Sequence, residues 1–153
     1  MRSKLSLLGL ALVLATINLL IASKERALDQ GRTVILELAP VDPRSLMQGD
    51  FMALNYALTQ KLPESAPDEG VIYLELDDRG VATSLSTRPL TGRTALHYHR
   101  EQGRVLFDTE SFFFQEGQGP LFTGARYGEL RVDREGYPIL VALLDPQLRR
   151  IEP

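Results

Sequence analysis

Three of the carboxylates that stand beside glycines are candidates for acid–base chemistry. They are Asp50 after Gly49, Glu116 before Gly117, and Glu129 after Gly128. Paired carboxyl groups exchange protons with a substrate when burial raises the pKa of one of them. Sequence spacing does not bring these three together, and each could instead accept backbone N–H groups at a turn or pair with an arginine such as Arg126 or Arg131. We favour this structural role and assign no catalytic residue.

Two histidines, His97 and His99, are two residues apart and would share one face of a strand. Their imidazoles could then reach one metal ion, but no third ligand accompanies them in the sequence. Arg93 and Arg100 flank the pair, which favours two solvent-facing side chains. We predict no metal site and no cofactor, and two histidines on one strand leave little for a Ser-His-Asp triad.

The segment "ARYGELRV" combines Arg126, Tyr127 and Glu129 at an expected helix-to-strand junction. A guanidinium there could hold an anionic ligand through two parallel hydrogen bonds, although an internal Arg–Glu pair is the commoner use. Arg126 and Tyr127 are therefore structural or binding candidates.

The segment "SFFFQEG" places Phe112 and Phe114 on one face of a strand and Phe113 on the other. A strand that is apolar on both faces is usually central in a packed domain. The alternative is that one phenylalanine lies on an exposed patch that binds a partner.

These side chains must be positioned by a domain that begins near Gly31. From there the apolar residues occur in runs of about five to eight, separated by glycine, proline and acidic turns. We predict a mainly β fold, a small β-barrel or sandwich with one short helix starting at Pro120. Hairpins are expected around residues 77–80, 101–103 and 133–136.

A Gly-Asp pair opens the apolar part of "LMQGDFMALNYAL", residues 46–58. A helix over residues 50–61 fits, because Asp50 could cap it and good helix formers follow. Alternation fits a strand equally well. One strand face would carry Met52, Leu54, Tyr56 and Leu58, and the other Phe51, Ala53, Asn55 and Ala57.

The N-terminus carries an uncharged apolar run, residues 5–22, with two basic residues on each side. As a helix it would span about 27 Å, close to the thickness of a bilayer's hydrocarbon core. A cleaved signal peptide is the alternative, but the best cut, after Ser23, puts Ile21 where a small residue is needed. We predict an uncleaved signal anchor over residues 1–26 and one domain over residues 27–153.

The flanking charges bear on orientation. Arg2 and Lys4 favour an N-terminus inside the cell, and Lys24 and Arg26 nearly balance them. The short cationic tail is similar to a signal anchor, which would place the domain outside the cytoplasm. Residues 27–153 hold 13 basic and 19 acidic side chains, a net charge of −6. That argues against nucleic acid or an anionic lipid surface as a partner of the domain.

Several blocks together carry a family resemblance. "GDFMALNY" resembles the signature of the GDYXXLXY family, with Phe51 where that family usually has tyrosine. "PVDPRSLMQ", "ESFFFQEGQGPLF" and "ARYGELRVDREGYPILVALLD" resemble its other blocks, so that the likeness covers most of residues 40–145. It implies a short, singly anchored bacterial membrane protein without an established activity. It also favours a strand that Gly49 and Asp50 introduce through a turn, with Leu54 and Tyr56 in the core.

A more distant likeness concerns type I signal peptidases, because "RSLMQGDFMAL" is similar to the segment after their nucleophile. Those enzymes need a serine five residues before the leucine, where this chain has Val41, and a lysine base from a later strand. The only lysines are Lys4, Lys24 and Lys61. A Ser-Lys dyad therefore cannot form in that arrangement.

The sequence as a whole predicts a single-pass protein of the bacterial inner membrane with a periplasmic domain. Its bilayer contact would be residues 5–22, and the resemblance to the GDYXXLXY family implies a polytopic membrane protein as its partner. We expect a non-catalytic accessory or interaction module. The alternatives are an envelope hydrolase, whose carboxylates would converge within about 10 Å, and a small-ligand or cation-binding module on the acidic turns.

Overall fold

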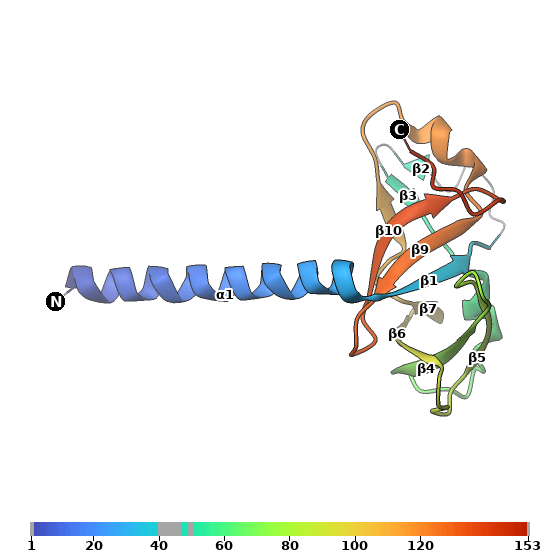
Figure 1. Ribbon diagram of the computed structural model, residues 1–153, viewed down its shortest axis with the longest axis horizontal. Helices are drawn as coiled ribbons and strands as arrows, with labels where there is room; N and C mark the ends of the chain where they lie inside the picture. Colours follow the sequence, from blue (N-terminus) through green and yellow to red (C-terminus); the bar gives the residue numbers. More distant parts are fainter. Residues whose placement is uncertain (1, 40–46, 49–50, 153) are drawn as a thin grey trace.

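Figure 1 shows a long N-terminal helix that ends at one side of a β-rich domain. The computed structural model describes residues 2–39, 47–48 and 51–152, without the side chains of residues 2–8, 23 and 47–48. Gly49 and Asp50 thus lie outside the described residues, and with them the predicted Gly-Asp turn. The elements are α1 (Arg2–Gln30), β1 (Arg32–Glu37), β2 (Met47–Gln48), β3 (Phe51–Ala53), η1 (Ala57–Lys61), β4 (Glu69–Leu76), β5 (Ala82–Ser86), β6 (Thr94–Glu101), β7 (Arg104–Leu106), β8 (Ser111–Phe113), η2 (Gly119–Gly124), β9 (Tyr127–Val132) and β10 (Pro138–Leu144).

The described strands form three antiparallel sheets, which confirms the mainly β prediction. Their orders are β1-β9-β10, β5-β4-β6-β7 and β2-β3-β8. The first lies in the middle of the domain in Figure 1, with the second below it and the third above it. All three expected hairpins are present, as β4–β5, β6–β7 and β9–β10. The helix expected at Pro120 is present as η2, a 3-10 helix.

The helix α1 runs into the first strand with one residue between them. Ala27, in its last turns, is buried, and Gly31 N–H donates to the Ala27 carbonyl at 2.9 Å. Arg131 on β9 holds the junction, since its Nη1 donates to the Gly31 carbonyl at 3.3 Å and to Thr33 Oγ1 at 2.7 Å. In the described part of the chain, no helix is both long and apolar enough to cross a membrane.

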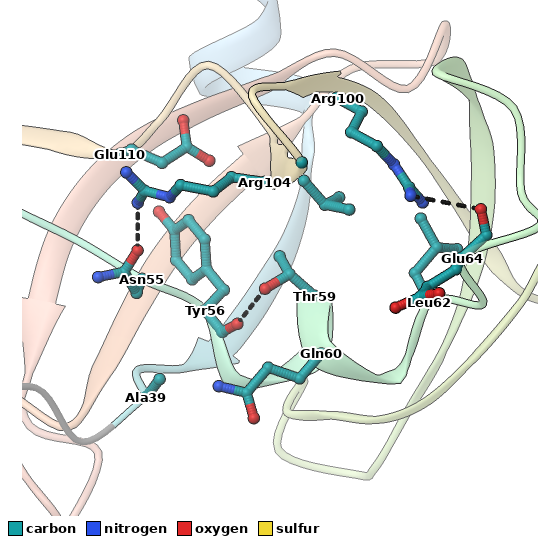
Figure 2. A pocket seen from close by; sticks show the side chains of 12 residues that line it. Ala39, Asn55, Tyr56, Thr59, Gln60, Leu62, Glu64, Arg100, Arg104 and Glu110 are labelled. Atoms are coloured by element: carbon teal, nitrogen blue, oxygen red, sulfur yellow. Dashed lines mark hydrogen bonds between the residues drawn. The ribbon is translucent and has the colours of Figure 1, made fainter.

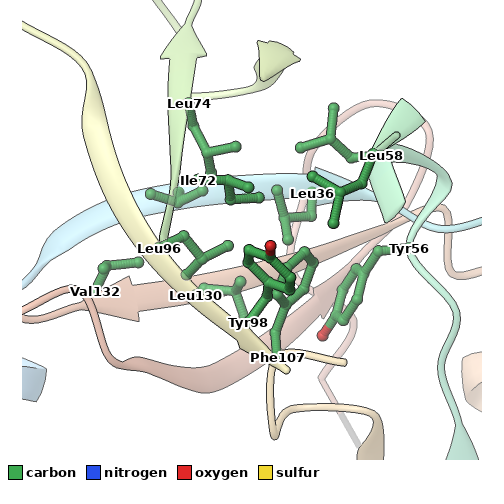
Figure 3. Close-up of a cluster of buried hydrophobic side chains, with 12 residues drawn as sticks. Leu36, Tyr56, Leu58, Ile72, Leu74, Leu96, Tyr98, Phe107, Leu130 and Val132 are labelled. Atoms are coloured by element: carbon green, nitrogen blue, oxygen red, sulfur yellow. The ribbon is translucent and has the colours of Figure 1, made fainter. Parts of the chain in front are cut away.

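The main core lies between the first two sheets (Figure 3). Alternate residues of β1, β4, β6 and β9 point into it, as the period of two in a strand requires. The burial pattern of β6 shows this, because Thr94, Leu96 and Tyr98 are buried and the residues between them are not. Residues from η1 and from the loop after β7 complete the core. The buried set is Val34, Leu36, Tyr56, Leu58, Leu62, Ile72, Leu74, Leu96, Tyr98, Phe107, Leu130 and Val132.

The segment after β3 combines the two predicted alternatives. Burial alternates as a strand requires, with Met52, Leu54, Tyr56 and Leu58 all buried. Pairing in β3 nevertheless ends at Ala53, and η1 begins at residue 57, so the prediction of one strand through residue 58 is wrong. The turn of η1 is stabilised locally, because the Thr59 hydroxyl donates to the Tyr56 carbonyl at 2.7 Å.

Two hairpin tips join the first sheet to the second. At the β9–β10 tip the Gly136 carbonyl accepts the His97 N–H of β6 at 2.9 Å. At the β4–β5 tip the Gly80 carbonyl accepts the Ile35 N–H of β1 at 2.8 Å. Each tip therefore covers backbone groups at the edge of the other sheet, which an exposed strand would leave unpaired.

Strand β8 is an edge strand of its sheet and not a central one, which corrects the first expectation for "SFFFQEG". Phe112 and Phe114 pack on Phe122 of η2, with ring centroids 4.9 and 5.5 Å apart. Phe113 points the other way, is 74% exposed and contacts Phe51 at 5.8 Å between centroids. The alternative of an exposed phenylalanine is the one that the structure contains.

The docking of the β9–β10 tip can be tested with Gly136→Ala. Gly136 has φ of +96°, and a Cβ there would lie 3.2 Å from His97 Cδ2 and 3.3 Å from the Ala95 carbonyl oxygen. The matched control is Gly103→Ala, with φ of +79° and open space around the position. We expect Gly103→Ala to cost about 1 kcal/mol through its backbone conformation alone, and Gly136→Ala about 1–2 kcal/mol more. Thermal unfolding followed by circular dichroism measures both; equal losses would contradict the docking.

Candidate functional site

A cavity of about 420 Å³ lies between η1 and the β6–β7 hairpin (Figure 2). Asn55 and Tyr56 enter it from the motif segment, and Arg100 and Arg104 enter it from the hairpin. Figure 2 shows Arg104 beside Asn55 at one end, and Arg100 beside Glu64 at the other. This cavity is the candidate site, because motif residues form part of its wall and charged groups gather there.

Tyr56 is a buried part of this wall. Its ring lies against Phe107, with centroids 5.6 Å apart, and over Gly128 of β9. A Cβ at Gly128 would stand 3.2 Å from Tyr56 Cε1, so the glycine makes room for the ring. The hydroxyl donates to the Thr109 carbonyl at 2.9 Å and lies 3.0 Å from Thr109 Oγ1. Burial raises the pKa of Tyr56, and the nearby Glu110 charge adds to the rise. The hydroxyl is therefore protonated at neutral pH and acts as a hydrogen-bond donor.

The loop after β7 is shaped by the Glu110 carboxylate. Oε1 accepts the Phe107 N–H at 2.6 Å and Oε2 accepts the Thr109 N–H at 2.9 Å. Between them Asp108 has φ of +61°, a conformation that aspartate tolerates better than most residues. The Glu110 carbonyl also accepts the Leu54 N–H at 2.7 Å. Both carboxylate oxygens of Glu110 are therefore committed to backbone groups of this loop.

Two guanidinium groups of the cavity contact only neutral acceptors in the described structure. Arg104 Nη2 donates to Asn55 Oδ1. Arg100 donates from Nη1 to the Glu64 carbonyl at 3.4 Å and from Nη2 to the Pro63 carbonyl at 3.3 Å, and its buried Nε has no partner among the described groups. Such a cavity can bind a polar or anionic ligand. Among its described residues, no nucleophile stands beside a base.

The predicted site residues do not gather in this cavity as a set. Leu54 and Tyr56 are both buried, as expected, and Phe51 faces the other way on β3. Glu116 and Gly117 form an exposed turn between β8 and η2. The exposed Arg126 and the half-buried Tyr127 lie where β9 begins.

Glu129 is engaged by an arginine that sequence reasoning did not select. Arg150 Nε donates to Glu129 Oε2 and Arg150 Nη2 to Glu129 Oε1, both at 2.8 Å. The predicted pairing of this carboxylate with an arginine is therefore present, but the partner is Arg150 and not Arg126 or Arg131, the two arginines named as examples. Arg150 lies beyond β10, and its backbone bridges to Leu144, so the end of the chain brings it to β9. These two hydrogen bonds lower the pKa of the Glu129 carboxyl, and the charges of Arg150 and Arg131 act in the same direction.

The two histidines have separate neighbours, although both lie on β6. His97 stacks on Tyr137 with centroids 4.2 Å apart, and its Nε2 lies 3.0 Å from the Glu135 carbonyl oxygen. Because that carbonyl only accepts, Nε2 carries the proton. His99 Nδ1 lies 3.6 Å from Asp108 Oδ1. The described residues contain no group of three or more histidine, aspartate or glutamate side chains placed to hold a metal ion.

Apart from Tyr56, sequence reasoning missed the polar residues that line the cavity, among them Asn55, Arg100, Arg104 and Glu110, and it also missed Thr109, the partner of the Tyr56 hydroxyl. A signal existed for Asn55, which lies between the two motif residues Leu54 and Tyr56. The two arginines flank the predicted β6–β7 turn, but only the packing of that hairpin against η1 shows that they face a cavity.

The fold and the cavity define a small, mainly β protein with a long N-terminal helix and a polar cavity whose wall includes a motif tyrosine. The chain belongs to the GDYXXLXY protein family, whose family model matches residues 13–143. This confirms the family resemblance. Comparisons with curated proteins and with solved structures gave no match.

The role of the Tyr56 hydroxyl can be measured with Tyr56→Phe. The substitution keeps the ring on Phe107 and Gly128 but leaves buried polar groups of Thr109 without their partner. We expect a loss of about 1–3 kcal/mol in unfolding free energy. The control is Tyr127→Phe, at a half-buried tyrosine whose hydroxyl has no hydrogen bond in the described structure, with an expected change within about 0.5 kcal/mol. Urea unfolding measures both, and equal effects would show that the Thr109 contact is unimportant.

The Glu129–Arg150 pair predicts a pH dependence of stability. Since the folded-state pKa of Glu129 lies below its unfolded value, the ionised carboxylate stabilises the fold fully above the unfolded value, about 4.3. This stabilisation is lost as the pH falls through the folded-state pKa. We expect Glu129→Gln to be less stable than the parent at pH 7. As the pH falls from about 5 to about 3, the unfolding free energy of Glu129→Gln should decrease less than that of the parent. Parallel pH curves of the two proteins would contradict the assignment.

Proposed function

We propose that this protein is a membrane-anchored accessory module of a bacterial inner-membrane assembly, with a non-catalytic domain on the periplasmic side that binds a polytopic membrane protein. The observation that carries the proposal is the surface of α1. Its large apolar side chains that the structure describes are exposed, and the helix itself extends away from the domain (Figure 1). The exposed set is Leu10, Leu12, Val13, Leu14, Ile17, Leu19, Leu20 and Ile21.

At about 100° per residue these side chains spread over more than half of the helix circumference, which is wider than the apolar stripe of a helix that packs on a domain. Leu12 and Leu19 are each 70% exposed. Burying one such side chain is worth about 1.5–3 kcal/mol, so together they require an apolar surrounding that the domain does not supply. The two polar residues among them are satisfied within the helix, because Thr16 donates to the Leu12 carbonyl and Asn18 to the Leu14 carbonyl. Such bonds are what hydrocarbon surroundings demand of polar groups.

The surface that we assign to the partner is an aromatic groove, defined by Phe112, Phe113, Phe114, Phe122 and Val141. It encloses about 480 Å³ and lies between β8 and β10, each an edge strand of its sheet. Unpaired strand edges accept an extended segment through backbone hydrogen bonds, and side-chain pockets then add specificity. We therefore propose that an extended apolar segment of the membrane partner occupies this groove.

Carboxylate chemistry receives less support from the contacts. Both carboxylate oxygens of Glu129 accept hydrogen bonds from Arg150. Glu116 lies on an exposed turn and, among the described residues, forms no hydrogen bond or ion pair with Glu129 or Arg150. A hydrolase that uses these two groups would have to break the arginine pair first. The polar cavity favours ligand binding as the second candidate, since Arg100 and Arg104 present donors to it without carboxylate partners. Shifts of the unfolding temperature with carboxylate or phosphate compounds would test that candidate.

Affinity purification of the tagged protein from its native membranes tests the leading proposal. We expect it to stay in the membrane pellet under alkaline extraction and to co-purify with a polytopic protein. Phe113→Glu should remove that partner without releasing the protein from the membrane. Leu90→Glu is the matched control, at a 48% exposed leucine in the β5–β6 loop, and should retain it. Purification of the parent protein without any membrane partner would contradict the proposal.

A further inference from the structure

A second cavity, of about 350 Å³, lies between the last turns of α1 and the β9–β10 tip. Lys24 and Arg26 line it from the helix, and Asp133, Arg134 and Glu135 line it from the tip. The buried Ala27 and the Arg131 contacts to Gly31 and Thr33 hold helix and sheet together here. The two walls of this cavity are therefore fixed relative to each other.

The cavity holds more uncommitted positive charge than negative charge. None of Lys24, Arg26 and Arg134 forms an ion pair or a side-chain hydrogen bond within the described part of the chain. Asp133 is partly committed, since its Oδ1 accepts the Tyr137 N–H at 2.8 Å. The cavity thus contains three cationic side chains and two carboxylates, of which only Asp133 accepts a hydrogen bond. This arrangement suits a small, strongly anionic group such as a phosphate.

The position of the cavity identifies the source of that group. Apart from Leu28 near the end of the helix, the exposed large apolar side chains of α1 end at Ile21, and Lys24 follows within one helical turn. A neighbouring cavity of about 390 Å³ shares Lys24 and includes Tyr137, which is 51% exposed. The stack on His97 holds the Tyr137 ring at this end of the domain. Tyrosine and basic residues just beyond an apolar helix are the groups that occupy the headgroup layer of a bilayer.

We propose that the α1 end and the β9–β10 tip bind the phosphate of an anionic phospholipid headgroup, through Lys24, Arg26 and Arg134, with Tyr137 in the interface beside it. The inference rests on the proposed membrane anchoring of α1 and adds a second, polar contact with the same bilayer. That contact sets the height and tilt of the domain, and with it the direction in which the aromatic groove faces.

The chain contains no tryptophan, so Tyr137→Trp places a single fluorescent probe at the tip. The full-length variant is reconstituted into vesicles of equal parts phosphatidylcholine and phosphatidylglycerol. In one set the phosphatidylglycerol carries a nitroxide on its acyl chain close to the glycerol, and in the other set the phosphatidylcholine does. Because the quencher is the same, the difference in quenching reports which headgroup is enriched at the tip.

We expect stronger quenching by labelled phosphatidylglycerol, with a local enrichment of about five-fold or more for a site that keeps its cations. In the Tyr137→Trp background, Lys24→Gln with Arg134→Gln should bring the two lipids close to parity, and Glu135→Gln should increase the difference. The matched control for charge is Lys61→Gln with Arg88→Gln, which removes two exposed cations elsewhere and should leave the enrichment unchanged. The control for position is Leu90→Trp, which should be quenched by neither lipid.

The outcomes separate this inference from the anchoring on which it rests. Equal quenching of Trp at position 137 by both lipids would overturn the headgroup site. A protein that floats with the vesicles but is quenched by neither lipid would also overturn it, and would leave the anchoring intact. A protein that does not float with the vesicles would overturn the anchoring itself. Enrichment that disappears only in the Lys24 and Arg134 variant supports the site.

Discussion

The buried contact of Tyr56 with Gly128 and Thr109 is the interaction on which the rest of the domain depends. The ring lies on the first sheet, and the hydroxyl reaches the loop after β7, so one side chain connects parts of the chain that are far apart in sequence. The Glu110 carboxylate shapes that loop by accepting two backbone N–H groups, and the Glu110 carbonyl accepts the N–H of Leu54. The polar cavity exists because the chain turns into η1 directly after this anchored tyrosine. Its wall is therefore a product of core packing.

A second constraint is the way in which the sheets are joined. Each hairpin tip places a glycine carbonyl on an N–H of the neighbouring sheet, at Gly136 and at Gly80. The β9–β10 hairpin does more than close the domain, because its tip also meets the end of α1 and carries Tyr137 against His97. These contacts join the helix, the first sheet and the second sheet at one tip. A change in the direction of α1 would be transmitted to the β6 edge, and the aromatic groove would turn with it.

Local patterns in the sequence predict local structure well here. The three hairpins, the alternating burial of residues 52–58 and the short helix at Pro120 follow from periodicity and turn chemistry, which depend on nearby residues alone. Apart from the early end of β3 at Ala53, the misses involve distant partners. Arg150 reaches Glu129 only because the chain end returns along β10, and β8 is an edge because no later strand pairs with it. Likewise Arg100 and Arg104 face a cavity only once η1 packs against their hairpin. Neither residue spacing nor composition predicts such contacts between residues that are distant in sequence.

The net charge of the domain and the charges at one place on its surface lead to different expectations about a membrane partner. A net charge of −6 over residues 27–153 argues against an anionic surface as a partner of the domain. Electrostatic interactions at a membrane surface, however, fall off within a Debye length of about 8 Å, so the charges next to the bilayer matter more than the total. The fold places Arg134 beside Lys24 and Arg26, which the count had left out as flanks of the anchor. A domain with a net negative charge can thus approach an anionic membrane through the cluster of basic residues at the end of α1.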